Sequence, residues 1–454
     1  MISKYYGENQ ATNCPKVPKH LSVGATYLFD QICEKTGVIE DLKISFPDIY
    51  KQLLSLSYYL LLEPNSNYYR FEKWHLNNKH PYGQGITSVE ADDILSKISS
   101  DSVNDFLSNQ ANRREGKEIL FYEISVIPSI TNLRYFVKSD QNSEDYLEPL
   151  HIIVLVDKNS GLPFFYKLLP GKITNLAILV DFIKPYNFLE DQKITYILDE
   201  SFYSETNLKF LFSQNADFII SAPKNLHFLQ QTLSTLEESW ESTSKNFKDY
   251  ESITMSKALQ VQFPTIITDT EQELGFLKDL FLTININPIK YNLEKHTLVN
   301  KIDFIISSLI NNNQLHEFLS SKLLKYIDTK KDNKNNLNLF SFNINQIHEL
   351  TFNSSVLILL SNFESTKIDT LDLYRRREFI KSSFYNFCDF LKVNSLSLIS
   401  DFPSEGILLI SFIKSKVILW LLNNLYGTEI LTKTPLLTLL DSLDNIKLII
   451  SDKN

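Results

Sequence analysis

The stretch Ile119-Leu120-Phe121-Tyr122-Glu123-Ile124 decides the fold class of this chain. It is a short apolar run with an acid near its end, and two similar runs follow at 151–157 (HIIVLVD) and 162–169 (LPFFYKLL). Apolar runs of this length predict buried strands, and Lys158-Asn159-Ser160-Gly161 predicts the turn between the last two. A β-sheet therefore begins near residue 118.

Downstream of these runs the pattern alternates between helix and strand. The spacing predicts helices over 176–183 and 204–213, and strands over 194–199 and 217–221. Hairpin-like strands followed by such an alternation are typical of an α/β core with a mixed sheet. Further on, the sequence predicts a less regular insertion, a return strand at 356–360, a polar loop at 330–336 and a long helix over 371–393.

The chain on either side of this core is predicted to be helical. Apolar residues from Leu21 to Gln110 recur at helical spacing, and Ser88 and Ser100 mark helix starts. The stretches 406–426 and 436–450 are also predicted to be helices. The expected domains are 1–117 (helical N-terminal domain), 118–225 (first part of the core), 226–352 (insertion), 353–398 (return strand and long helix) and 399–454 (helical C-terminal segment).

Composition limits the class of protein. The 454 residues are 43% hydrophobic and 22% charged, which excludes wholesale disorder and predicts several globular domains. The net charge is -9, and residues 1–120 carry 13 Lys and Arg against 15 Asp and Glu, so no basic DNA-binding footprint is evident. The three Cys form no CxxC pair, which favours a cytoplasmic location. Lys414 and Lys416 interrupt the longest apolar run, so no membrane helix is expected.

Two acids stand at the predicted ends of buried strands. Glu123 and Asp199 each close an apolar run, and two such carboxylates at one sheet edge would offer oxygen ligands to Mg²⁺. A purely structural role for both acids remains the alternative.

Several ordered motifs resemble bacterial insertion-sequence transposases of the DDE class. Residues 162–175 (LPFFYKLLPGKITN) are similar to the family stretch G-L-P-l-x-Y-x-l-x-P-G-N-x-x-D. Residues 199–208 (DESFYSETNL) resemble D-R-G-F-Y-S-E-E-N-L, and 374–384 (YRRREFIKSSF) resemble Y-R-x-R-D-x-I-E-x-x-F. Upstream, 121–125 (FYEIS) resembles Y-D-x-T-S, so the likeness runs from about Gly24 to the C-terminal helices.

The resemblance implies a ribonuclease H-like core in which three carboxylates hold two magnesium or manganese ions for DNA cleavage and strand transfer. It places the catalytic positions at Glu123, Asp199 and Lys381, with Glu123 and Asp199 as the metal-binding acids. It also implies transposon-end DNA as partner, contacted by Tyr374 and Arg377 with the neighbouring Arg375 and Arg376, and allows a homodimer.

The third catalytic position departs most from the family. Lys381 stands where the family has Glu, and an ammonium there opposes a divalent cation and is free to pair with Glu123 or Asp199 instead. Glu123 is one methylene longer than the Asp of the family. Further departures are Ser201 for Gly, Asn175 for Asp and Cys388 for Lys, the last predicted to be a buried thiol.

Three functions follow as hypotheses. The first is a transposase homologue whose fold persists while its nuclease site is inactive. The second is an active magnesium-dependent transposase that recruits an acid other than these. The third is an interaction scaffold that does not bind DNA, which the acidic net charge favours.

Overall fold

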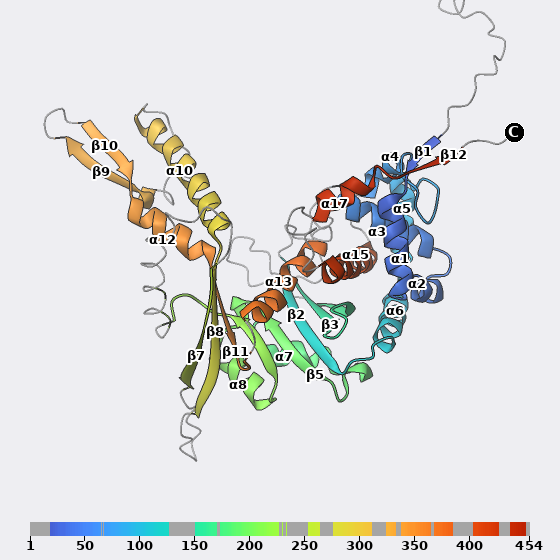
Figure 1. Ribbon diagram of the computed structural model, residues 1–454, viewed down its shortest axis with the longest axis horizontal. Helices are drawn as coiled ribbons and strands as arrows, with labels where there is room; N and C mark the ends of the chain where they lie inside the picture. Colours follow the sequence, from blue (N-terminus) through green and yellow to red (C-terminus); the bar gives the residue numbers. More distant parts are fainter. Residues whose placement is uncertain are drawn as a thin grey trace, which may run out of the picture. The chain divides into compact units, whose positions relative to one another are not determined.

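The computed structural model describes ten stretches of the chain (Figure 1), namely 19–126 except 65 and 67, 150–169, 173–226 with 229 and 233, 253–263, 276–310, 324–332, 337–364, 367–384, 403–425 and 436–450. The chain divides into two compact units. Unit 1 comprises 1–173, 181–193 and 376–454, and unit 2 comprises 174–180 and 194–375. Each is built from segments that are distant in the sequence.

Helices form most of the N-terminal part of unit 1, as predicted. They are α1 (Gly24–Lys35), α2 (Val38–Ser45), α3 (Tyr50–Leu62), α4 (Phe71–His75), α5 (Ser88–Ser96) and α6 (Ser100–Asn112). The caps of α5 and α6 lie one residue before the predicted starts. The Thr87 hydroxyl accepts from the Glu90 N–H while the Glu90 carboxylate accepts from Thr87, and Ser99 caps α6.

The C-terminal helices belong to the same unit. Helix α15 (Pro403–Leu425) packs against α3, α5 and α6, and α17 (Leu436–Leu443) packs against α1 and α3. Lys414 and Lys416 of α15 are only 3% and 5% exposed, so this helix is buried along most of its length. None of the described helices has the length and hydrophobicity needed to cross a bilayer.

The first and last described strands pair with each other. Strand β1 (Lys19–Ser22) runs antiparallel to β12 (Lys447–Ile450), with Lys19 opposite Ile450. The predicted helix over 436–450 is therefore wrong beyond Leu443, because the apolar run KLII finds a strand partner more than 420 residues away in sequence.

The three predicted strands of the core's first part are confirmed. Strands β2 (Glu118–Val126), β3 (Leu150–Asp157) and β4 (Pro163–Leu169) form antiparallel ladders in the order β4-β3-β2. The turn between β3 and β4 lies at the predicted place, with Gly161 at a φ of 66°. Nearly every described side chain of β3 and β4 is buried, as expected for apolar strands covered on both faces.

Unit 2 contains the strands that make the core mixed. Strand β5 (Lys193–Leu198) pairs in parallel with β6 (Asp217–Ser221), and α8 (Glu205–Ser213) lies between them in sequence. Strands β11 (Val356–Ser361), β8 (Phe276–Ile286) and β7 (Ile253–Phe263) follow as antiparallel neighbours. Helix α7 (Leu176–Asp181) precedes β5. The predicted α/β fold with a mixed sheet is confirmed.

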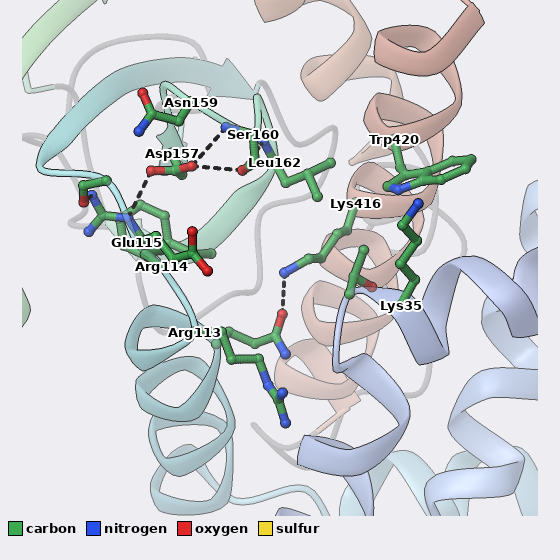
Figure 2. Close-up of a pocket in the computed structure, with 14 residues that line it drawn as sticks. Lys35, Arg113, Arg114, Glu115, Asp157, Asn159, Ser160, Leu162, Lys416 and Trp420 are labelled. Atoms are coloured by element: carbon green, nitrogen blue, oxygen red, sulfur yellow. Dashed lines mark hydrogen bonds and ion pairs between the residues drawn. The ribbon is translucent and has the colours of Figure 1, made fainter.

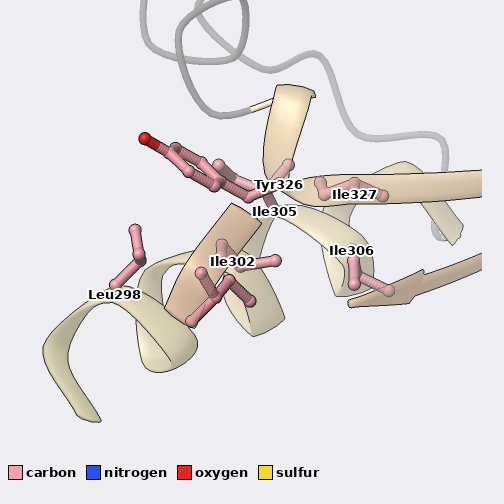
Figure 3. Packing of buried hydrophobic residues seen from close by; sticks show 7 residues of the cluster. Leu298, Ile302, Ile305, Ile306, Tyr326 and Ile327 are labelled. Carbon is pink, nitrogen blue, oxygen red and sulfur yellow. The ribbon is translucent and has the colours of Figure 1, made fainter. Parts of the chain in front are cut away.

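The stretch 226–352 is more regular than expected. Besides β7 and β8 it contains α10 (Pro288–Ile310), the hairpin of β9 (Ile327–Asp332) and β10 (Leu337–Phe342), and the start of α12 (Ile344–Ser355). Leu298, Ile302 and Ile305 of α10 form a small core with Tyr326 and Ile347 (Figure 3). The polar residues of α10 concealed this pattern in the sequence. Of the predicted polar loop, 330–332 belong to β9 and 333–336 lie outside the described residues.

The long helix that carries the third motif is α13 (Lys367–Ser383). It starts four residues before the predicted helix. The part of the prediction beyond Phe384, including Cys388 and its buried thiol, lies outside the described residues.

Candidate active site

Glu123 lies in the middle of β2 and not at the end of a strand. It stands opposite Ile153 of β3, and β2 continues for three more residues to Val126. The prediction that Glu123 closes its strand is therefore wrong. Its side chain is 0% exposed, which places a carboxylate within an otherwise apolar layer.

Two basic residues hold this buried carboxylate. The His151 Nδ1 lies 2.7 Å from Glu123 Oε1, and the Arg377 Nη2 lies 3.4 Å from Oε2. Arg377 Nε also donates to the Glu123 backbone carbonyl at 2.8 Å. His151 and Arg377 are themselves only 3% and 4% exposed. The charge of Glu123 is thus compensated inside the protein by a buried ion pair.

The protonation of His151 follows from its second nitrogen. The Ile173 N–H donates to His151 Nε2 at 3.2 Å, so Nε2 is an acceptor and carries no proton. The ring proton is then on Nδ1, where it is donated to Glu123. His151 therefore acts as a neutral donor, and Arg377 supplies the compensating positive charge.

Asp199 directly follows the carboxyl end of β5, as predicted. Its side chain is half-buried and caps the short turn Glu200–Phe202. The Ser201 N–H and hydroxyl both donate to Asp199 Oδ1, at 2.9 and 2.5 Å. Ser201 is one of the residues that depart from the family motif, and its hydroxyl here occupies an oxygen of the second acid.

Asn207 gives the rest of the motif at 199–208 a structural role. Its side chain is 1% exposed and joins three backbone groups: Nδ2 donates to the carbonyls of Thr174 and Phe202, and Oδ1 accepts from the Leu176 N–H. Ser204 caps α8 by accepting from the Asn207 N–H. These motif residues position α7 and α8.

The four predicted DNA-contacting residues of α13 differ in how far their side chains are buried. Tyr374 and Arg377 are buried, Arg376 is partly buried and Arg375 is exposed. Arg375 Nη2 lies 3.4 Å from Asn285 Oδ1. The predicted basic cluster is therefore split, and Arg375 is its one exposed member.

Lys381 is exposed near the end of α13. Both carboxylate oxygens of Glu123 have other partners, so the suggested pair between Lys381 and Glu123 is not formed. Glu378, which precedes Lys381 by three residues, is 62% exposed and lies 3.5 Å from Arg377 Nη1.

The donors around Glu123 do not suit a divalent metal. A magnesium site needs several carboxylate or carbonyl oxygens, whereas Glu123 has a guanidinium and a donating imidazole as neighbours. Within the described stretches, no group of three His, Cys, Asp or Glu side chains is arranged to hold a metal ion.

His151 is the functional-site residue that the sequence reasoning missed. In the sequence it is only the first residue of an apolar run. The register places Ser125 opposite His151 and Glu123 opposite Ile153, so Glu123 and His151 are diagonal neighbours on one face. A polar residue opening the run HIIVLVD was the available signal.

Comparison with known proteins identifies the family. The family model described as "Transposase DDE domain" matches residues 134–380, which is more than half of the chain. The matched range includes Asp199 and 374–377, and it leaves out Glu123 and Lys381. No curated protein matches the chain. Transposases of this kind act on DNA and generally use divalent metal ions. The match, together with the mixed α/β fold and the retained motifs, shows that the chain belongs to the transposase DDE domain family.

Proposed function

We propose that this protein is a DDE transposase homologue that keeps the fold and DNA binding of its family but does not cut DNA. The observation that carries the proposal is the state of Glu123. Its carboxylate is fully buried and held by His151 and Arg377 on separate oxygens. Recruiting this carboxylate to a metal would require breaking a desolvated ion pair.

The other two positions support the same conclusion. Asp199 has one oxygen occupied by two donors from Ser201. Lys381 brings a positive charge where the family has a metal-binding carboxylate, and a positive charge opposes cation binding. All three changes weaken the site in the same direction, while the Asn207 network that supports the fold is intact.

Calorimetric titration with Mn²⁺, a proxy for Mg²⁺, tests the proposal most directly. The full chain and the variant Asp199→Ala are titrated side by side. The exposed acid Asp181 supplies a control, Asp181→Ala, because its carboxylate lies at the surface and pairs with the neighbouring Lys184. We expect no stoichiometric Mn²⁺ binding in any of the three. Mn²⁺ binding by the wild type and Asp181→Ala that is absent in Asp199→Ala would contradict the proposal and support an active transposase.

A nicking assay tests the chemistry itself. Supercoiled plasmid is incubated with the protein and Mn²⁺, and conversion to the relaxed form is followed on a gel. We expect no conversion above a no-protein control. Nicking by the wild type that Asp199→Ala abolishes would support the second hypothesis, an active enzyme that uses a further acid.

The double variant Glu123→Asp with Lys381→Glu tests how far the inactivation extends. If the proposal is right and the pocket is otherwise intact, this variant gains Mn²⁺ binding that the wild type lacks. Absence of a gain would mean that Ser201 and the pair with Arg377 also block the site.

The scaffold hypothesis receives support from one observation. Two of the four predicted DNA-contacting side chains, Tyr374 and Arg377, are buried. Fluorescence polarisation with a labelled 30-bp duplex at low salt separates the alternatives, because phosphate contacts are strongest there. Binding that weakens steeply with added salt supports the DNA binder, and absence of binding supports the scaffold.

Location and assembly belong to the same proposal. Burial raises the pKa of the Cys33 thiol to about 12, which suits an unreactive thiol in a reducing cytoplasm. A homodimer is tested by sedimentation velocity with and without the 30-bp duplex.

A further inference from the structure

Unit 1 contains a cavity of about 700 Å³ that lies away from Glu123 and its partners. The end of α1, the end of α6, the turn between β3 and β4, and α15 enclose it (Figure 2). A volume of this size is typical of small-molecule sites, which range over about 300–1,000 Å³. Its lining includes four cationic side chains, Lys35, Arg113, Arg114 and Lys416, and the indole of Trp420.

Lys416 is the most unusual of these side chains. It is only 5% exposed, it extends from α15 into the cavity (Figure 2), and its Nζ donates to Gln110 Oε1. An ammonium has three N–H donors, and Gln110 is the one acceptor that the described residues provide. None of the described carboxylates lies within ion-pair distance of it. A buried ammonium without a paired anion is costly.

The nearby acids are already committed to arginines. Asp157 accepts from Arg114 at 3.4 Å and from the Ser160 N–H and hydroxyl at 2.8 Å each. Asp41 accepts from Arg113 at 2.7 and 2.8 Å and from Gln110 Nε2 at 2.5 Å. Arg113 also donates to Glu40 at 2.8 Å, and these contacts leave none of the described carboxylates paired directly with Lys416.

Lys35, Trp420 and Glu115 also line the cavity. Lys35 is exposed and its Nζ lies 5.4 Å from the centre of the Trp420 ring. Glu115 is an exposed acid of the lining. The interior of the cavity is therefore positive beside an aromatic wall, with a single unpaired acid that faces solvent.

We propose that this cavity binds a phosphoryl anion, with Lys416 as its buried cation, Lys35 as a second cation and Trp420 as an aromatic wall. An ammonium is a compact point charge suited to phosphate oxygens. Burial lowers the pKa of Lys416 to about 8, and an anion in the cavity would stabilise its charged form. The anion has two sources, a free nucleotide or a backbone phosphate of DNA, and only the second rests on the proposed function.

The test uses the full chain and follows its tryptophan fluorescence, to which Trp420 of the cavity contributes, during titration with inorganic phosphate, pyrophosphate and AMP. Three variants are compared with the wild type. Lys416→Met removes the charge, and Lys416→Arg keeps it. Lys414→Met is the matched control, because Lys414 is a buried lysine of the same helix that does not line the cavity. Near-UV circular dichroism confirms that each variant is folded.

We expect phosphoryl binding in the wild type and in Lys414→Met, partial binding in Lys416→Arg, and binding at least ~10-fold weaker in Lys416→Met, which corresponds to one lost charged contact. Equal binding by the wild type and a folded Lys416→Met would overturn the proposal. So would failure of all three phosphoryl probes to bind the wild type.

The two sources are separated by the 30-bp duplex. If Lys416→Met weakens binding of both AMP and duplex, a backbone phosphate occupies the cavity. If it weakens AMP binding alone, the ligand is a nucleotide. If the wild type binds phosphate but no duplex, the phosphoryl site stands while the DNA-binding part of the proposed function fails.

Discussion

The side chain of Arg377 contacts both the main-chain carbonyl and the carboxylate of Glu123, which lies 254 residues earlier in the sequence. Nε donates to the Glu123 carbonyl at 2.8 Å, and Nη2 lies 3.4 Å from Oε2. The guanidinium therefore fixes both the position of strand β2 against α13 and the charge of the only acid within that strand's interior. The contact that stabilises the fold is also the one on which the proposed loss of activity rests.

Replacing Arg377 with Met should destabilise the protein strongly. It leaves the Glu123 carboxylate buried without its cation, and breaking a buried pair in this way costs about 3–5 kcal/mol. The double variant Glu123→Leu with Arg377→Met should recover much of this loss, because apolar residues of similar volume avoid the charge altogether. Urea unfolding of the four proteins gives the coupling free energy.

Lys381→Met serves as the control for this cycle. Lys381 is exposed on the same helix, so its replacement should change the free energy of unfolding by less than about 0.5 kcal/mol. Additive effects of Glu123→Leu and Arg377→Met would contradict the buried pair.

The tautomer of His151 is a second prediction. Long-range ¹H–¹⁵N NMR spectra should show a proton on Nδ1 and an unprotonated Nε2, because Ile173 donates to Nε2 and Glu123 accepts from Nδ1. A proton on Nε2 would mean that the His151 contacts are assigned the wrong way round.

A third prediction concerns alkaline pH. Burial lowers the pKa of Lys416 to about 8, so between pH 8 and 10.5 the unfolded chain holds a proton that the folded protein has released. Stability from this group is therefore lowest below pH 8, rises through that interval and is fully gained above it, by about 3 kcal/mol for a shift of this size. Lys416→Met should lack this part of the rise in urea midpoints measured from pH 7.5 to 10.

Asp41, Arg113, Cys33 and Asp157 also act on Lys416, and all of them stay in the variant. The difference between the two pH profiles thus isolates the lysine. Superimposable slopes would show that Lys416 is not desolvated.

The fourth prediction compares two glycines with the same backbone conformation. Gly37 and Gly83 both have a φ of 73°, where a side chain is strained by about 1–2 kcal/mol. A Cβ at Gly37 would also collide with the Arg113 guanidinium that holds Asp41, whereas nothing lies within 4 Å of a Cβ at Gly83. Thermal unfolding should show Gly37→Ala to be the more damaging by at least ~1.5 kcal/mol, the lower end of the net worth of a hydrogen bond to a charged group. Equal losses would mean that Arg113 moves aside at no cost.

The apolar strands were predictable because a short run of contiguous apolar residues is enough to indicate a buried strand. Runs such as HIIVLVD need no knowledge of the rest of the chain, and β2 to β6 and β11 were placed within a few residues. Strand β12 was missed because four residues form a strand only when β1 is available as a partner. The regularity of α10 was hidden by its polar face.

The site was predictable only in part, for a similar reason. Asp199 follows its strand directly, so its position is local information. The burial of Glu123 and its pairing with His151 depend on the β2–β3 register, and the contact with Arg377 depends on a helix packed from the far end of the chain. The sequence motifs identify Glu123 and Asp199 but not the side chains that contact them.

The pairing of β1 with β12 constrains how the protein is made. Unit 1 needs the strand at 447–450 and the helices α15 and α17, which are synthesised after all the other described elements. The N-terminal helices must therefore wait, with Leu53, Leu60 and other core residues uncovered, while more than 300 further residues are synthesised. During translation this chain should depend on chaperones that shield apolar segments. A truncation before residue 447 should leave the N-terminal helices, which are synthesised first, the least protected against aggregation.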